Sequence, residues 1–241
     1  MLTTVRIMTY NIRGCQGADG HTDPDRTARV IAEGAADIVA LQEVSKGQLN
    51  ALAQRLGMTP YTPPHEGGLA FLSFYPLKGV QEYDLGGGGM CLRADADIGG
   101  KRLHLLNVRL DTHCQRRRCQ IDHLFGPDLL GHRALVCPTL IIGDFADFWW
   151  GAGNLGLHMG LRKAPRPFWN ATYPSGFPLW GRDRAYLRGD LKILHATIDR
   201  SRLTRQASTH LPLILTLQVV DSRTFLRVKE MSRRCMEIAP G

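Results

Sequence analysis

The sequence lacks any apolar run of the roughly 18–20 residues that a membrane-spanning helix needs. Residues 1–11 also lack the basic start, the long apolar middle and the small-residue cleavage site of a signal peptide. We therefore expect a cytoplasmic protein. Repeats, linkers and low-complexity segments are missing too, which favours a single folded unit over an array of small ones.

Several catalytic signatures are also missing. The six cysteines include no C-x-x-C pair, so a thioredoxin-type redox site or a zinc ribbon has no support, and free thiols are expected in the cytoplasm. The four glycines at 86–89 are not followed by Lys-Ser or Lys-Thr, as a phosphate-binding P-loop would require. No nucleophile elbow of a serine hydrolase is present.

Acidic residues are outnumbered, with 22 Asp and Glu against 30 Lys and Arg and a net charge of +8. Lysine is scarce as well, because 24 of the 30 basic residues are arginine. Arginine binds phosphate in a bidentate manner that lysine cannot reproduce, and a positive field attracts polyanions such as nucleic acid, anionic lipid headgroups or phosphorylated metabolites. A solvated basic face explains the same composition, so charge alone does not identify a partner.

Apolar and β-branched runs predict strands at residues 4–11, 37–43, 69–73, 79–83, 90–98, 102–110, 138–143, 182–187, 191–198 and 211–219. Capping and periodicity predict helices that begin at Asp23-Pro24, span 46–56 before Gly57, cover about 116–130, and form one short turn at 154–160.

This order of elements favours an α/β fold of two mixed, mainly antiparallel sheets packed face to face with helices outside. A doubly wound parallel sheet is disfavoured because residues 69–110 hold too many strands without crossover helices. We expect residues 1–220 to form this single domain and residues 221–241 to form a basic C-terminal tail.

Two acidic residues stand directly after apolar strands. Glu43 follows Ile-Val-Ala-Leu-Gln, and Asp144 follows Leu-Ile-Ile-Gly. The end of a buried strand is a rigid place from which to present a carboxylate to a cleft. Strand-end acids also serve as ordinary caps and turn formers, so these two positions do not define a site by themselves.

Six short motifs follow one another along the chain. They are Thr9-Tyr10-Asn11, Leu41-Gln42-Glu43, Leu72-Ser73 with Pro76-Leu77, Gly143-Asp144-Phe145, Asp183-Arg184, and Ser208 with His210-Leu211-Pro212. Their order and spacing resemble the endonuclease/exonuclease/phosphatase superfamily, and within it the small bacterial branch. The resemblance covers roughly residues 4–220 and implies a four-layer, deoxyribonuclease-like α/β sandwich.

The resemblance further implies divalent-metal hydrolysis of a phosphoester. Glu43 matches the metal-binding glutamate and Asn11 the asparagine beside it, with Mg²⁺ or Mn²⁺ as the cofactor. Asp144 matches the aspartate that orients or deprotonates the attacking water. Asp183 and His210 match an Asp–His pair whose histidine contacts the phosphoryl oxygen.

Three positions depart from the family pattern. Ala146 stands where the family has Asn, Thr209 where it has Asp, and Arg109 where it has a phosphate-contacting His. Losing one preorganised donor typically lowers a rate by about 10²–10³-fold. Arg109 adds a positive charge that either repels a metal or binds the substrate phosphate, and we predict Arg109 and Arg184 as phosphate contacts.

Two functions therefore remain open. The first is a metal-dependent phosphodiesterase or phosphatase that is weakened or altered by the residues at 109, 146 and 209. The second is an inactive protein of the same fold that binds nucleic acid, anionic lipid or a protein partner through a basic cleft. Metal affinity at Glu43 discriminates between them. The fold does not select the phosphoester, because its members cleave DNA, RNA, lipids and inositol phosphates.

Overall fold

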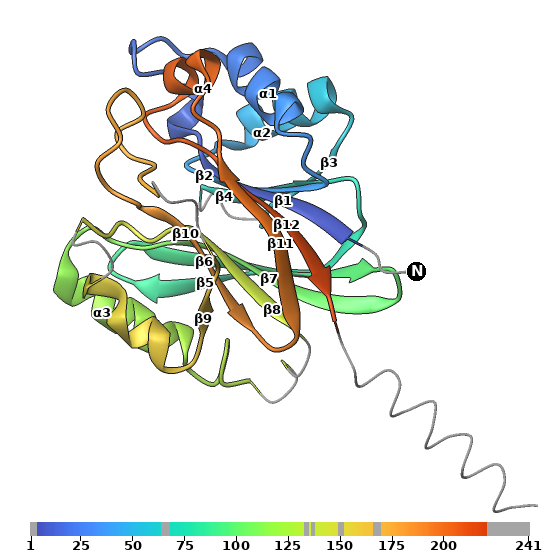
Figure 1. Ribbon diagram of the computed structural model, residues 1–241, viewed down its shortest axis with the longest axis vertical. Coiled ribbons are helices and arrows are strands. Elements are labelled where there is room, and N and C mark those ends of the chain that lie inside the picture. The colour runs from blue at the N-terminus through green and yellow to red at the C-terminus, as the bar shows by residue number, and fades with distance from the viewer. Residues whose placement is uncertain are drawn as a thin grey trace, which may run out of the picture.

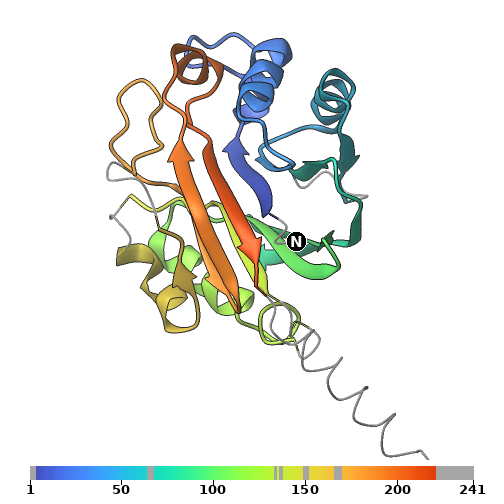
Figure 2. The same cartoon turned by 45° about the vertical axis from the view of Figure 1, so that its right-hand side comes forward.

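Two six-stranded sheets stacked face to face form the centre of the molecule (Figure 1). The computed structural model describes residues 4–63, 68–132, 135, 138–148, 152–165 and 170–220. Helices lie on both outer sides of the sheet pair, which the view turned by 45° also shows (Figure 2). The prediction of a four-layer α/β sandwich is confirmed, while the predicted tail, residues 221–241, lies outside the described residues.

The first sheet has the strand order β11-β12-β1-β2-β4-β3. Its strands are β1 (Thr4–Asn11), β2 (Ile38–Gln42), β3 (Thr59–Tyr61), β4 (Leu69–Ser73), β11 (Leu191–Ile198) and β12 (Leu213–Val219). Only the β1–β2 pair is parallel among the pairings of this sheet. The short β3 has no counterpart among the predicted strands.

The second sheet has the order β5-β6-β7-β8-β10-β9. Its strands are β5 (Leu77–Gly86), β6 (Gly89–Ile98), β7 (Lys101–Arg109), β8 (Thr139–Asp144), β9 (Arg162–Lys163) and β10 (Asp183–Arg188). Its parallel pair is β7–β8, and its other pairings are antiparallel. Both sheets are thus mixed and mainly antiparallel, as predicted.

The helices begin and end where the sequence offers caps. In α1 (Pro24–Glu33), the Asp23 side chain accepts a hydrogen bond from the Arg26 amide, and α2 (Lys46–Leu56) ends at Gly57 with a φ of 64°. The other helices of the described residues are α3 (Cys114–Leu124), α4 (Arg202–Ala207) and the 3₁₀ segments η1 (Arg13–Cys15) and η2 (Ala152–Met159). The prediction of a helix to residue 130 was wrong, because the Gly-Pro pair at 126–127 ends α3 early.

Three apolar clusters hold the layers together. One fills the space between the sheets, a second lies between the first sheet and helices α1 and α2, and a third lies under α3. Alternate residues of a strand belong to different clusters. In β1, Val5 and Ile7 face the other sheet, while Met8 and Tyr10 face the helices.

The inner faces of both sheets become polar at one end of the sandwich. Gln42 Nε2 donates to Thr9 Oγ1 at 3.0 Å and to Asn107 Oδ1 at 2.7 Å, which joins β1, β2 and β7 across the gap. All three side chains are buried. Buried amides of this kind fix the relative position of the sheets because their donors have partners. Beyond them lie Asn11, Asp144 and Asp183.

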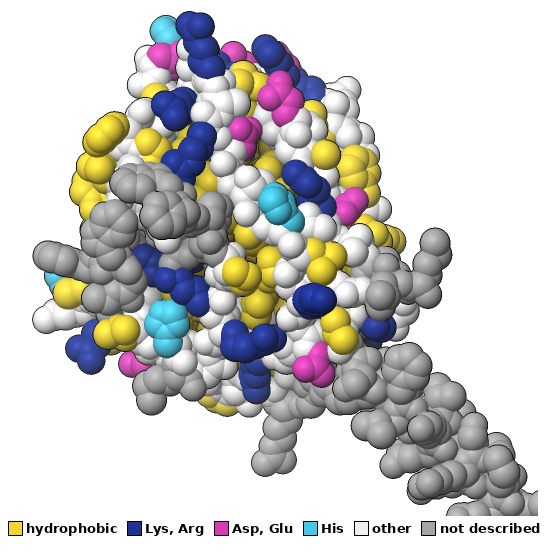
Figure 3. Space-filling view, viewed as in Figure 1, with side chains coloured by type: hydrophobic (Ala, Val, Ile, Leu, Met, Phe, Trp, Pro, Cys, Tyr) yellow, Lys and Arg dark blue, Asp and Glu magenta, His cyan; other side chains and the backbone are white. Residues whose placement is uncertain are grey.

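The described part of the chain holds no helix that is both long and apolar enough to cross a bilayer. Its four cysteines are free thiols, with Cys15 and Cys91 buried and Cys114 and Cys119 exposed. The expectation of free thiols is therefore confirmed at these four positions. Basic side chains are spread over the face seen in Figure 3, rather than gathered in a single patch.

Candidate active site

The candidate site lies where strands of the two sheets end at the polar side of the sandwich. Asn11 is the last residue of β1, Asp144 the last of β8 and Asp183 the first of β10. Leu140 and Ile142 of β8 face the other sheet, so the two-residue period of a strand places Asp144 on that inner face as well. Asp183 pairs in register with Asp144 in the antiparallel β8–β10 ladder.

Gly143 allows β8 to approach β7 closely beside the site. Its φ of 145° is one that side chains rarely adopt, and a Cβ atom there would lie 1.9 Å from the Val108 carbonyl oxygen. Glycine is therefore required before Asp144. The close approach sets Asp144 opposite Arg109 in the parallel register of the two strands.

Asp144 is the centre of the hydrogen-bond network. Its Oδ1 atom accepts from the Ala146 amide at 2.8 Å, and its Oδ2 atom accepts from Asn11 Nδ2 at 3.1 Å. His210 Nε2 lies 3.9 Å from Oδ2. Burial acts to raise the pKa of Asp144, but the charges of His210 and Arg182 and these hydrogen bonds outweigh it and lower the pKa, so Asp144 is ionised.

His210 and Asp183 form a buried pair. The His210 Nδ1 atom lies 2.9 Å from Asp183 Oδ2, which leaves Nε2 directed towards Asp144. The loop that carries the histidine is fixed to β1, because the His210 amide donates to Ser208 Oγ and Ser208 Oγ donates to the Asn11 carbonyl. Burial opposes the charged imidazole, yet Asp183 and Asp144 outweigh burial and raise the pKa of His210.

The raised pKa of His210 predicts a pH-dependent contribution to stability. The pKa of histidine in the unfolded chain is about 6.5. The pair therefore stabilises the fold fully below that pH, and this stabilisation is lost as the pH rises through the higher pKa of His210 in the folded protein. Asp183→Asn is expected to lower the free energy of unfolding most near pH 5.5 and least near pH 9.5. Urea denaturation of both proteins across this range measures the difference, and a loss that stays constant with pH would contradict the assignment.

Glu43 follows β2 in a left-handed backbone conformation, with a φ of 56°. Two hydrogen bonds hold this turn, from the Gly14 amide to the Glu43 carbonyl at 2.7 Å and from the Val44 amide to the Gly68 carbonyl at 3.1 Å. The Glu43 Oε1 atom accepts from Asn11 Nδ2 at 2.9 Å. A non-glycine residue kept at positive φ costs stability, and such residues concentrate at functional sites.

The donors around Glu43 fit a weakly held divalent cation. Mg²⁺ is often bound by one or two carboxylates, several waters and a substrate phosphate, and Glu43 uses only one carboxylate oxygen in its bond to Asn11. Asn11 Oδ1 accepts from the Arg13 amide, and its Nδ2 faces Glu43 and Asp144. Asn11 thus positions the two carboxylates in this geometry, rather than offering its oxygen to a metal as we predicted. Over the described ranges, three or more His, Cys, Asp or Glu side chains are nowhere grouped to hold a metal.

The structure places Arg182, which had no predicted role, inside the site. Its guanidinium makes a two-point contact with Asp144, with Nε 3.2 Å from Oδ1 and Nη2 2.8 Å from Oδ2. The aromatic rings of Phe148 and Tyr173 lie beside it, with centroids 5.2 Å and 4.8 Å from Cζ. The sequence shows Arg182 only as one of several arginines near Asp183, and nothing in that pattern marks it.

Arg184 lies on the opposite side of β10, and its predicted role as a phosphate contact is corrected. Asp183 faces the other sheet, so the next residue along the strand points outwards. Its side chain is 1 % exposed, with Nη2 2.9 Å from Asp147 Oδ2 and Nε donating to the Gly181 carbonyl. The guanidinium is buried and hydrogen-bonded within the fold, so a substrate cannot contact it.

The three departures from the family pattern all border the site. Arg109 ends β7 beside Asp144, and its Nη2 atom makes a long contact of 3.5 Å with the Gly88 carbonyl. Ala146 is buried with a φ of 49°, two residues after Asp144. Thr209 lies next to His210, and its carbonyl accepts from the Ser175 amide.

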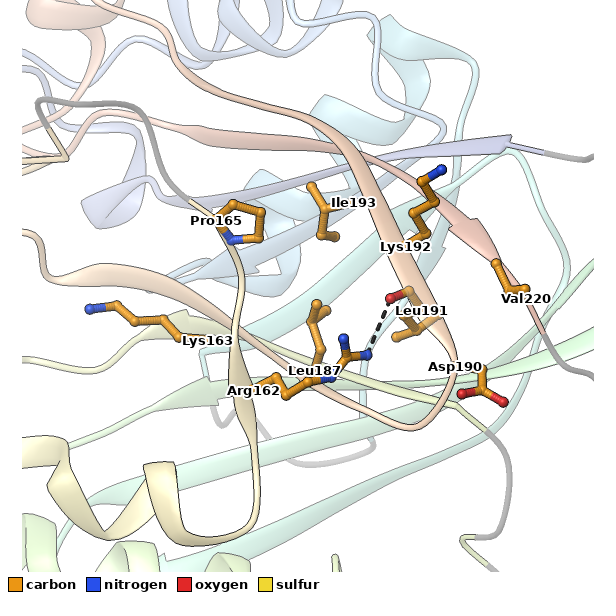
Figure 4. A pocket seen from close by; sticks show the side chains of 9 residues that line it. All are labelled: Arg162, Lys163, Pro165, Leu187, Asp190, Leu191, Lys192, Ile193 and Val220. Carbon is orange, nitrogen blue, oxygen red and sulfur yellow. Dashed lines mark hydrogen bonds between the residues drawn. The ribbon is translucent and has the colours of Figure 1, made fainter.

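A separate hollow of about 570 Å³ lies between β9 and β11 (Figure 4). Its lining includes the basic side chains of Arg162, Lys163 and Lys192, and Arg162 Nη2 donates to the Leu191 carbonyl across it. None of the predicted site residues lines this hollow. It is therefore distinct from the cluster around Asp144.

Comparison with known structures supports the fold assignment. An endonuclease/exonuclease/phosphatase from Beutenbergia cavernae is 21 % identical, with a TM-score of 0.69 over 90 % of this chain and 72 % of that one. A mannosyl-6-phosphatase from Bacteroides thetaiotaomicron is 15 % identical, with a TM-score of 0.74 over 88 % and 99 % of the two chains. TDP2 from D. rerio, complexed with single-strand DNA product, is 17 % identical, with a TM-score of 0.72 over 89 % and 98 %.

No curated protein sequence matches this chain. The model of the Endonuclease/Exonuclease/phosphatase family matches residues 8–210, a span that runs from β1 to His210 and includes each strand end at the candidate site. The matched residues and the sandwich of two mixed sheets agree, and the chain belongs to the endonuclease/exonuclease/phosphatase family.

Proposed function

We propose that this chain hydrolyses phosphoesters at the cluster formed by Asn11, Glu43, Asp144, Asp183 and His210, at a rate reduced by its departures from the family pattern. The observation that carries the proposal is the buried His210–Asp183 pair, whose Nε2 atom faces the Asp144 carboxylate. A cationic donor and an ionised acceptor side by side are what phosphoryl transfer to water requires.

In the proposed reaction, the oxygen of a water molecule bonds to phosphorus and its proton passes to the Asp144 carboxylate. The ester P–O bond breaks, and its electron pair leaves with the departing oxygen. His210 in its charged form donates from Nε2 to a phosphoryl oxygen and stabilises the negative charge that develops there. Asp183 holds the ring in place and favours the charged form.

Glu43 is the residue proposed to hold Mg²⁺ or Mn²⁺, with Asn11 fixing its carboxylate. When bound, the cation would supply charge neutralisation at the phosphate. Arg109 is proposed as a further phosphate contact because it borders Asp144 and, within the described ranges, its guanidinium makes a single long hydrogen bond, to the Gly88 carbonyl. Thr209 has no charge to offer a cation, which is consistent with weak metal binding.

The substrate class proposed is a phosphoester carried by a nucleic acid, a lipid headgroup or a phosphorylated small molecule. Two structures of similar fold support the range, since one is named a mannosyl-6-phosphatase and the other is complexed with a DNA product. The excess of basic residues suits each of these anionic molecules.

A second candidate function is binding of the same phosphoesters without turnover. The specific observation in its favour is the contact of Arg182 with both oxygens of Asp144, which engages the proposed proton acceptor. In this case the cleft would retain its affinity for phosphate while Asp144 takes up no proton. Turnover separates the two functions directly.

The test combines calorimetry with Mg²⁺ and Mn²⁺ and hydrolysis of bis(p-nitrophenyl) phosphate and p-nitrophenyl phosphate. The informative variant is Glu43→Gly, because glycine accepts the positive φ of this position and the fold is retained. Metal binding and turnover are both expected to fall by at least about 10²-fold. Glu33→Gln, at the exposed end of α1, is the matched control and should behave as the unmodified protein.

Absence of turnover of both reporters by the unmodified protein would reject the hydrolase proposal and leave the binding function. Turnover that survives in Glu43→Gly would reject the metal assignment at Glu43 alone.

A further inference from the structure

The Arg182 guanidinium is held by Asp144 and lies against two neighbouring aromatic rings. Its side chain is 12 % exposed, and Asp144 is 1 % exposed. Its guanidinium lies within 5.2 Å of the centroids of Phe148 and Tyr173. Aromatic faces stabilise a planar cation without using its N–H donors, so the rings hold the group while its donors exchange partners.

Four donors occupy the Asp144 carboxylate. The Ala146 amide and Arg182 Nε bind Oδ1, and Asn11 Nδ2 and Arg182 Nη2 bind Oδ2. An ionised carboxylate has about four lone-pair positions in total. With all four in use, Asp144 has no position from which to accept a proton from water. Arg182 supplies two of the four donors, so its departure frees one position on each oxygen.

A bound phosphoryl group offers Arg182 an alternative partner at the same place. Phosphate oxygens match the planar guanidinium fork as well as a carboxylate does, and they carry more negative charge. His210, whose ring lies 4.8 Å from that of Tyr173, directs Nε2 to the same carboxylate edge that Arg182 Nη2 contacts. An oxyanion placed at His210 is therefore within the region that the guanidinium of Arg182 can reach.

We propose that Arg182 is a phosphate-binding residue that exchanges the Asp144 carboxylate for the phosphoryl oxygens of the bound substrate. This inference rests on the proposed function, because it assigns the substrate phosphate to the same site. Substrate binding thereby releases Asp144 at the moment when a proton acceptor is needed. Without substrate, the Arg182–Asp144 contact keeps one acceptor position on each carboxylate oxygen occupied.

The test is calorimetric binding of inorganic phosphate to the full chain in the presence of a chelator, so that neither metal nor turnover enters the result. Arg182→Met is expected to weaken phosphate binding by about 10- to 100-fold, the value of a bidentate charge-assisted contact. Asp144→Asn is expected to tighten it by about 10-fold, because the carboxylate no longer competes for Arg182. Arg182→Lys, which keeps the charge without the fork, should fall between the unmodified protein and Arg182→Met.

The double variant Arg182→Met/Asp144→Asn separates exchange from a general change in charge. If Asp144 competes for Arg182, the Asp144→Asn change has no effect once Arg182 is absent, and the double variant binds phosphate as weakly as Arg182→Met. The double variant also removes both charges together, so neither is left buried and unpaired. Equal tightening by Asp144→Asn with and without Arg182 would overturn the proposal, as would unchanged binding in Arg182→Met.

The hydrolase proposal fails separately from this one. Phosphate binding with the expected pattern but no turnover of either reporter would uphold the exchange and reject hydrolysis. Turnover, together with phosphate binding that is unchanged in Arg182→Met, would reject the exchange and uphold hydrolysis.

Discussion

Replacing His210 with alanine is expected to lower kcat for bis(p-nitrophenyl) phosphate by about 10³-fold. The imidazole Nε2 atom lies 3.9 Å from the Asp144 carboxylate, and the pair with Asp183 raises the pKa of His210 and so favours its charged form. Its removal takes away a preorganised donor in a water-poor site, where such donors have their largest effect. Initial rates at saturating metal measure the loss.

His195 provides a matched control for this variant. It is an exposed histidine on the edge strand β11, remote from the polar end of the sandwich. His195→Ala is expected to keep the full rate. Equal rates for His210→Ala and the unmodified protein would remove His210 from the chemistry, and equal losses in both histidine variants would point to a nonspecific effect on folding.

Ala146→Asn is expected to raise kcat by about 10²-fold, the lower end of what one oxyanion donor contributes. The family pattern has Asn at this position, and Ala146 lies two residues after Asp144 at the buried end of β8. Its φ of 49° lies in the left-handed region, which asparagine tolerates better than alanine. The backbone is thus already in the conformation that suits the missing residue.

Ala146→Asp is the control for the effect of side-chain size. Aspartate also tolerates a positive φ and has nearly the same volume, but its ionised side chain donates no hydrogen bond. Its rate should stay at or below that of the unmodified protein. A gain in both variants would mean that filling space, rather than donating a hydrogen bond, limits the reaction.

The positions of the main site residues follow from patterns that the sequence displays. β1, β2 and β8 were predicted from their apolar runs, and the order and spacing of the motifs at their ends, which resemble the family pattern, assigned Asn11 and Asp144 to one site. The start of α1 and the end of α2 were also predicted from sequence, because Asp23-Pro24 favours a helix N-terminus and Gly57 accepts the positive φ that ends a helix. Short elements such as β3, β9 and α4 were missed because two to six residues are too few to show a period.

The side-chain positions of the two arginines beside Asp183 could not be predicted from such patterns. Arg184 lies within β10, and the two-residue period of the strand directs its side chain outwards to Asp147. Assigning that direction from sequence requires the residue at which the strand begins. Arg182 precedes the strand, where no period applies, and its place is set by the loop in which the Phe145 amide donates to the Arg182 carbonyl. Its contact with Asp144 joins residues 38 positions apart and could not be read from local sequence.

The orientation of the Asn11 amide was also beyond the sequence. Asparagine can present either an oxygen to a metal or a nitrogen to a carboxylate, and both suit a residue beside Glu43. The choice is decided by the Arg13 amide, which occupies Oδ1 and turns Nδ2 towards Glu43 and Asp144. The Asn11 amide therefore holds two carboxylates in place, and Glu43 is the one proposed to bind a cation.

The most direct test of hydrolysis at this site is the reaction of bis(p-nitrophenyl) phosphate in ¹⁸O-labelled water, with mass analysis of both products. If the site directs water to phosphorus, ¹⁸O enters the phosphoryl product and not the nitrophenol, and His210→Ala forms the labelled product about 10³-fold more slowly. Absence of labelled phosphoryl product from the unmodified protein, or its equal formation by His210→Ala, would contradict the claim that this site directs water to phosphorus.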